Sequence, residues 1–169
     1  PEIFEGKHSS VSYITEYNKI ESGKEMKVIL NIKLHDDWHS YWENPGDSGF
    51  PVAIETNDKN IQAISKAKYQ IPEVIAFEDL VNFGYHDETN LIFNLKLADK
   101  IKKGKKSLNI KISYLICKDI CIPEIIDTVI DIKIAKNSEA NPKYETAYNR
   151  IYNLFANDVI NNAKFNISE

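Results

Sequence analysis

Two cysteines, Cys117 and Cys121, are the residues of this 169-residue chain best suited to covalent chemistry. Three residues separate them, and apolar sequence typical of strands lies on both sides. A disulfide requires Cα atoms within about 4.4–6.8 Å, whereas an extended chain would hold these two roughly 13 Å apart. If the pair bonds, the sequence Lys118-Asp119-Ile120 must therefore form a tight turn at the end of a strand.

A bond that closes only five residues stabilises a fold by about 2 kcal/mol in the chain-entropy treatment, which is little for a disulfide. The small gain favours a chemical role, in which one thiolate attacks a partner's disulfide and the second resolves the mixed disulfide. A small structural disulfide and two buried free thiols remain open as alternatives. We expect no metal and no cofactor, because two thiolates need further ligands and none of the four histidines has ligand spacing to them; the histidines are His8, His35, His39 and His86.

The charged neighbours of the cysteines have opposite effects on the formation of a thiolate. Lys118 favours a thiolate at Cys117, whereas Asp119 and Glu124 disfavour one nearby. The sequence does not decide which effect is larger.

Composition excludes several classes of partner. Hydrophobic residues make up 43% and charged residues 27%, as in ordinary globular domains, and the formal net charge is -4. This charge argues against nucleic acid or an anionic membrane surface as the partner. No apolar run reaches the roughly 20 residues of a membrane span, so we expect no direct membrane insertion of this chain. A close cysteine pair on an apparent strand points to an extracytoplasmic compartment.

Alternating apolar residues predict antiparallel strands, most clearly over 26–34, 91–97, 108–116 and 126–134. Shorter strands are expected at 9–17, 38–42, 52–56, 61–69 and 73–77, and a basic hairpin tip around Gly104. Eight or nine short strands with regular turn signals predict an all-β antiparallel sandwich. The alternation before Cys117 predicts that its side chain faces away from the buried row.

A different pattern follows Asn141-Pro142. Apolar residues recur at three- and four-residue spacing and predict an amphipathic helix over about 143–157; they are Tyr144, Tyr148, Ile151, Tyr152, Phe155 and Val159. The polar tail from Asn161 has no evident structure. We therefore divide the chain into a sandwich domain, 1–138, and a C-terminal helix and tail, 139–169.

Several aromatic residues are either core side chains or a shield for a reactive sulfur, namely Trp38, Tyr41, Trp42, Phe83 and Tyr85. The segment 78–88 is expected to be a loop with Gly84 as its flexible point, so that its aromatics cover the cysteines. Within that segment, Glu78 and Asp79 are solvated acids or tune the thiols. His39 is a polar surface residue or a proton relay.

Three segments together resemble one family: 38–49 (Trp-His-Ser-Tyr-Trp-Glu-Asn-Pro-Gly-Asp-Ser-Gly), 82–85 (Asn-Phe-Gly-Tyr) and 115–124 (Leu-Ile-Cys-Lys-Asp-Ile-Cys-Ile-Pro-Glu). They are similar to the periplasmic amino-terminal domain of the DsbD/ScsB-type transmembrane thiol reductases. The resemblance runs from about residue 10 to 134, and the predicted helix suits the ScsB-like branch.

The resemblance implies an immunoglobulin-like sandwich in the bacterial periplasm. Such a domain takes electrons from a membrane-embedded reductase domain and passes them to thioredoxin-like periplasmic proteins, including disulfide isomerases, cytochrome c maturation factors and copper-tolerance proteins. Cys117 and Cys121 match the redox pair, and Phe83 and Tyr85 match the cap loop that shields it. The periphery of the site is then formed by Trp38, His39, Tyr41, Lys118 and Asp119.

Two departures accompany the resemblance. The better-known DsbD domain has a longer spacer between its cysteines, and the membrane and thioredoxin-like domains are missing, as in a fragment or a freestanding relative. The expected activity is that of a protein-disulfide reductase, with Cys121 as the attacking residue. The alternatives are a non-enzymatic immunoglobulin-like binding module with a structural bridge, and a periplasmic copper-binding protein. The sequence names neither the partner, the direction of electron flow nor the oligomeric state.

Overall fold

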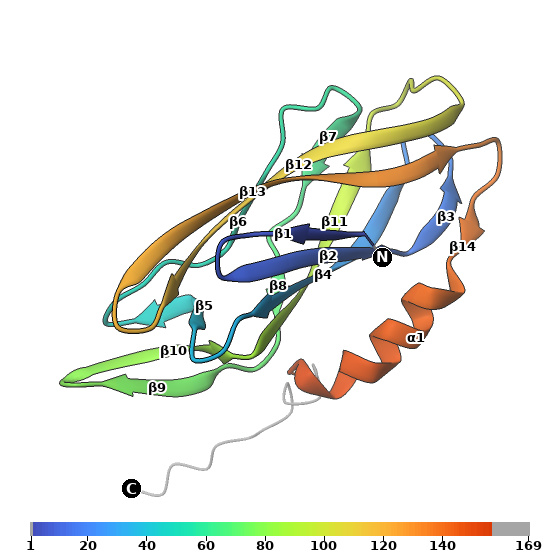
Figure 1. Ribbon diagram of the computed structural model, residues 1–169. Helices are drawn as coiled ribbons and strands as arrows, with labels where there is room; N and C mark the ends of the chain where they lie inside the picture. The colour runs from blue at the N-terminus through green and yellow to red at the C-terminus, as the bar shows by residue number, and fades with distance from the viewer. Residues whose placement is uncertain (1, 157–169) are drawn as a thin grey trace, which may run out of the picture.

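Two β-sheets pack face to face in the computed structural model, which describes residues 2–156 (Figure 1). One short helix follows the last strand and lies beside the sandwich. The predicted all-β, immunoglobulin-like sandwich with a C-terminal helix is confirmed.

The first sheet has the order β1-β2-β4-β11-β7, and β8 also pairs with β11. Its strands are β1 (Ile3–Glu5), β2 (Ser9–Thr15), β4 (Glu25–Leu34), β7 (Ile61–Ile64), β8 (Lys68–Tyr69) and β11 (Glu88–Leu97). At its centre β4 and β11 pair antiparallel, with Leu30 opposite Leu91. Because side chains alternate along a strand, the apolar rows of both strands face the second sheet and are buried there.

The second sheet has the order β14-β3-β13-β12-β5-β10-β9, and β6 also pairs with β12. Its strands are β3 (Tyr17–Ile20), β5 (His39–Gly46), β6 (Ala53–Glu55), β9 (Glu73–Phe77), β10 (Leu80–His86), β12 (Gly104–Cys117), β13 (Cys121–Ile134) and β14 (Glu139–Ala140). β12 and β13 form one continuous hairpin from Gly104 opposite Ile134 to Cys117 opposite Cys121. This hairpin crosses the whole sandwich and carries both cysteines to one end of it (Figure 1).

Two sequence-based expectations about connections are wrong. The basic segment around Gly104 is not a hairpin tip, because β11 belongs to the first sheet and β12 to the second, so the segment joins the two sheets. The segment 78–88 is not a loop either, since most of it is the strand β10, paired on both sides with β5 and β9. Short strands of this kind are stabilised by their neighbours in the sheet, which a local pattern does not report.

The helix α1 (Pro142–Ile151) continues into a 3-10 turn, η1 (Tyr152–Leu154). Its buried residues Tyr144 and Ile151 pack with Phe155 against Ile29 on the outer face of the first sheet. Ile29 is the one apolar residue on the otherwise polar face of β4, and the helix explains it. The predicted helix is confirmed, while Val159 and the tail from Asn161 lie outside the described residues.

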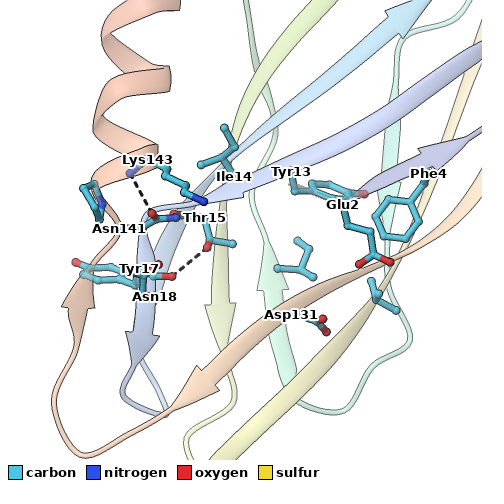
Figure 2. A pocket seen from close by; sticks show the side chains of 13 residues that line it. Glu2, Phe4, Tyr13, Ile14, Thr15, Tyr17, Asn18, Asp131, Asn141 and Lys143 are labelled. Carbon is cyan, nitrogen blue, oxygen red and sulfur yellow. Dashed lines mark hydrogen bonds between the residues drawn. The ribbon is translucent and has the colours of Figure 1, made fainter.

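The start of α1 is held by Asn141, whose side chain accepts a hydrogen bond from the backbone N–H of Lys143 at 3.1 Å (Figure 2). Its amide group also donates to the carbonyl of Thr15 in β2 at 2.9 Å. One side chain thus caps the helix and attaches it to the sheet. Because β14 pairs with β3 just before the helix, the segment after residue 138 is joined to the sandwich, and the boundary at 138/139 stays a prediction.

We expect Asn141→Ala to lower the free energy of unfolding by about 1 kcal/mol, the usual cost of losing a helix cap. Urea unfolding followed by circular dichroism measures the change. Asn137→Ala is the matched control, because Asn137 is an exposed asparagine in the preceding turn, and it is expected to change stability by less than about 0.5 kcal/mol. Equal effects of the two substitutions would contradict the capping role.

Candidate redox site

The two cysteines are bonded at the closed end of the β12–β13 hairpin, with an S–S distance of 2.03 Å and Cα atoms 4.1 Å apart. They are directly opposite each other in the antiparallel register, where Cα atoms lie roughly 4.5–5.5 Å apart. The backbone N–H of Lys118 donates to the carbonyl of Ile120 at 3.1 Å and closes the turn. The predicted tight turn at a strand end is confirmed.

The two sulfur-bearing residues differ in their access to solvent. Cys121 is exposed, whereas Cys117 is only 3% exposed. The unbroken register of β12 keeps Cys117 on the face opposite the row that ends at Ile116. It is buried all the same, because His39 of β5 pairs with it and Tyr41 of β5 covers it. The sequence predicted the face of Cys117 correctly and placed His39 and Tyr41 at the periphery of the site, but it assigned the cover to Phe83 and Tyr85.

Tyr41 and His39 form a chain of contacts that begins at the sulfur. The Tyr41 hydroxyl donates to Cys117 Sγ at 3.0 Å, and His39 Nε2 lies 3.3 Å from the Tyr41 oxygen. Burial raises the pKa of Tyr41, so its hydroxyl is protonated at neutral pH. Burial, and then the nearby His86, lower the pKa of His39, so its imidazole is neutral at pH 7. His39 is therefore a buried neutral base rather than a polar surface residue.

Charged residues surround this chain on two sides. The ring of His86 in β10 lies 5.9 Å from that of His39, and its Nδ1 is 3.0 Å from a carboxylate oxygen of Glu73 in β9. On the other side, the Lys118 ammonium contacts the Asp37 carboxylate at 2.9 Å. Asp37 raises the pKa of Lys118, which keeps the lysine charged beside the disulfide.

Gly49 holds the ring of Tyr41 in place. It has φ +97°, and a Cβ atom added to it would lie 2.4 Å from two carbons of the Tyr41 ring. The backbone at Gly49, shortly after the end of β5, therefore packs directly against the Tyr41 ring, an approach open only to glycine.

Gly49→Ala is expected to displace Tyr41 and to destabilise the domain. Gly104→Ala is the matched control, because Gly104 also has a positive φ, +120°, but has no atom within 4 Å of an added Cβ. Backbone strain alone costs about 1–3 kcal/mol at either position, and the steric overlap at Gly49 adds about 1–3 kcal/mol. Thermal and urea unfolding measure both changes, and equal losses would contradict the packing role of Gly49.

A family model described as thiol:disulfide interchange protein DsbD, N-terminal, matches residues 12–132. The chain belongs to this family. Among solved structures, it is similar to the N-terminal periplasmic domain of ScsB from Proteus mirabilis, with 22% identity and a TM-score of 0.64 over 88% of this chain. The chain spans 55% of that ScsB chain. A reduced DsbD N-terminal domain from Neisseria meningitidis aligns with 75% of this chain and 90% of its own, with 15% identity and a TM-score of 0.42. No curated protein matches the sequence.

The predicted cap residues of this DsbD-family domain lie on the inner side of β10. Tyr85 is buried in the main core, where its hydroxyl donates to the carbonyl of Gln70 at 2.7 Å. Phe83 packs edge-on against Trp42, with ring centroids 6.2 Å apart. The ring that contacts the sulfur is that of Tyr41. A shielding role for Phe83 and Tyr85 stays a prediction and would require β10 to move.

The remaining predicted residues of the periphery are near the hairpin turn or beside β5. Asp119 is exposed in the turn between the cysteines. Trp38, just before β5, stacks on His8 with ring centroids 4.4 Å apart. The structure therefore brings His39, Tyr41 and Lys118 to the disulfide, and uses Trp38 to attach the N-terminal segment beside it.

A buried carboxylate near the cysteines was not recognised as structural from the sequence. Glu124 of β13 accepts hydrogen bonds from the Ser9 hydroxyl at 2.5 Å and from the His8 backbone N–H at 2.6 Å. Ser9 also lies 2.6 Å from the hydroxyl of Tyr114 in β12. This network joins the start of β2 to the cysteine hairpin. An acidic residue at an inward position of an alternating strand was the available signal.

A groove of about 590 Å³ lies at another part of the molecule, between the edge strands and the start of α1 (Figure 2). Its lining comes from β1, β2, β3, β13 and the helix N-terminus, and includes Phe4, Tyr13, Tyr17, Asp131 and Lys143. The residues predicted for the redox site are not part of this lining, so the groove is separate from the disulfide chemistry.

Over residues 2–156, no cluster of three or more His, Cys, Asp or Glu side chains has an arrangement that would hold a metal ion. Within the same residues, no helix combines the length and apolar character of a membrane span.

Proposed function

We propose that this chain is a periplasmic protein-disulfide reductase domain, which relays electrons through Cys117 and Cys121 from a membrane-embedded reductase to thioredoxin-like proteins. Membership of the DsbD N-terminal family supports thiol–disulfide exchange. The periplasmic compartment is supported by the similarity to a periplasmic ScsB domain. We infer the membrane reductase, as the electron donor, and the thioredoxin-like class of partner from the family to which this chain belongs.

The observation that carries the proposal is the unequal exposure of the two cysteines. In the reduced domain, the exposed Cys121 thiolate attacks one sulfur of a partner's disulfide, and the partner's other sulfur leaves as a thiolate. The buried Cys117 then attacks Cys121, and the bond between Cys121 and the partner breaks with its electron pair on the partner's sulfur. The domain is oxidised by two electrons and the partner is reduced by two.

Exposed apolar side chains near the disulfide support a protein as the substrate. Ile120, between the cysteines, is 66% exposed. The β9–β10 hairpin adds exposed Val74, Leu80 and Val81, and it lies at the same end of the molecule as the cysteine turn (Figure 1). Apolar surface around a reactive centre is typical of a docking site for another protein.

Two measurements test the proposal: electron transfer from the reduced chain to a partner's disulfide, and the reduction potential of the Cys117–Cys121 pair. We expect the reduced chain to reduce the disulfide of a thioredoxin-like protein, and the double variant Cys117→Ser, Cys121→Ser to transfer nothing. Equilibration with glutathione buffers is expected to give a potential above about -300 mV, as for exchanging disulfides. A lower potential without transfer would favour the rival function, a binding module with a structural bridge.

A further inference from the structure

The chain of contacts from Cys117 through Tyr41 to His39 ends in a neutral base that exchange chemistry can use. We propose that Tyr41 and His39 carry the proton of Cys117 when this sulfur enters or leaves the disulfide. The inference rests on the proposed function and adds a route for the proton to it. Tyr41 is then a catalytic residue, because it touches the reacting sulfur, and His39 is a positioning residue that acts through Tyr41.

The need for such a route follows from the burial of Cys117. A thiol must lose its proton before its sulfur attacks a disulfide. The side chain of Cys117 is only 3% exposed, so bulk water does not reach it directly. Cys121 is exposed and exchanges its proton with solvent. Only the step that uses Cys117 therefore requires help from the protein.

In the mixed disulfide, the Cys117 thiol proton moves to the Tyr41 oxygen while the Tyr41 hydroxyl proton moves to His39 Nε2, which becomes an imidazolium. The electron pair left on Cys117 forms the bond to Cys121 Sγ. The bond between Cys121 and the partner breaks, and the partner leaves as a thiolate. In the reverse direction, His39 returns the proton through Tyr41 to Cys117 as this sulfur leaves the disulfide.

The Tyr41 hydroxyl lies 3.0 Å from Cys117 Sγ, within hydrogen-bond reach. His39 Nε2 lies 3.3 Å from the Tyr41 oxygen, a contact that must shorten slightly for proton transfer. The side chain of His39 is only 9% exposed, so it exchanges protons mainly with the residues that contact it. Tyr41 contacts the side chains of Cys117 and His39, and these two residues are directly paired across β12 and β5. Backbone pairing therefore sets the geometry of the relay.

Burial first, and then the neighbouring His86, lower the pKa of His39 and favour its neutral form. On one side, His86 of β10 lies near the ring, and Glu73 of β9 pairs with His86. On the other side, Lys118 of the cysteine turn pairs with Asp37, just before β5. Neither carboxylate is paired with His39 itself, since Glu73 contacts His86 and Asp37 contacts Lys118. A neutral imidazole at pH 7 is the form that accepts a proton.

The relay predicts which step of the reaction depends on His39 and Tyr41. The reduced 169-residue chain is mixed with glutathione disulfide and quenched with acid at successive times. Mass spectrometry then separates the mixed disulfide from the intramolecular disulfide. We expect His39→Gln and Tyr41→Phe to slow closure of the Cys117–Cys121 bond at pH 7 by on the order of 10²-fold. Formation of the mixed disulfide at Cys121 is expected to keep its wild-type rate, measured in a Cys117→Ser background.

The pH profile separates a proton relay from a structural role. As the pH is lowered, the imidazole of His39 becomes protonated and the wild-type closure rate is expected to fall. Because the pKa of His39 is lowered, the inflection in the rate is expected at a pH below the ordinary histidine pKa of about 6.5. This inflection is expected to disappear in His39→Gln. In Tyr41→Phe it is also lost from the rate, although His39 still titrates by NMR.

His86→Gln is the matched control, since it removes a neighbouring imidazole that is outside the chain of contacts. We expect it to keep the inflection and to move it to higher pH, because His86 lowers the pKa of His39. Closure rates and inflections unchanged in both His39→Gln and Tyr41→Phe would overturn the relay while leaving the exchange function intact. A wild-type chain that never forms the mixed disulfide would instead overturn the proposed function.

Discussion

Cys121→Ser is expected to abolish electron transfer to a disulfide-bonded thioredoxin-like partner, with a loss on the order of 10³-fold or more, as for removal of a nucleophile. Cys117→Ser is expected to react once and to accumulate a mixed disulfide. The reason is the structural difference between the residues, because the exposed Cys121 meets the partner and the buried Cys117 resolves the intermediate.

Each single variant serves as the control for the other. Trapped complexes are separated on non-reducing gels, identified by mass, and released by dithiothreitol. If Cys117→Ser were inert and Cys121→Ser trapped the partner, the assignment of the attacking residue would be reversed. If neither variant trapped a partner that the wild type reduces, exchange through this pair would be excluded.

Glu124→Ala is expected to lower the free energy of unfolding by roughly 3–5 kcal/mol, because it removes two hydrogen bonds to a buried carboxylate and leaves the His8 backbone N–H without its acceptor. The donors are the Ser9 hydroxyl and the His8 backbone N–H. Urea unfolding of the oxidised chain at pH 7 measures the change.

Glu55→Ala is the matched control for this substitution. Glu55 is also a glutamate on a strand of the second sheet, but its exposed side chain meets Lys111 only at 4.0 Å. Such a surface pair contributes less than about 1 kcal/mol. A loss of stability in Glu124→Ala no greater than that in Glu55→Ala would show that the buried network is not what joins β2 to the cysteine hairpin.

The long alternating segments show what the sequence determined about the fold. The apolar alternation in β4, β11, β12 and β13 requires each strand to bury one face, and two such sheets bury their faces against each other. The same local rule located α1, whose apolar residues recur with the helical period. The spacing of Cys117 and Cys121 also required the turn, because a disulfide over three intervening residues permits no extended chain.

The structure decided which residues reach the sulfur. β10 was expected to be a loop, because its mixture of acids, aromatics and Gly84 has no clear period, and pairing with β5 and β9 makes it a strand. Tyr85 consequently belongs to the core, and Tyr41 covers Cys117. The contact between Tyr41 and Cys117 joins residues 76 positions apart in the sequence, and local patterns carry no information about it.

The cysteine pair itself therefore followed from the sequence, through two residue types, their spacing and the strands on either side. The difference between an exposed Cys121 and a buried Cys117 is a property of the tertiary structure alone. It arises because β5 pairs with only one side of the hairpin end, and places His39 and Tyr41 over one of the two sulfurs. Sheet pairing brings these groups together, and it assigns different chemical roles to two identical residues.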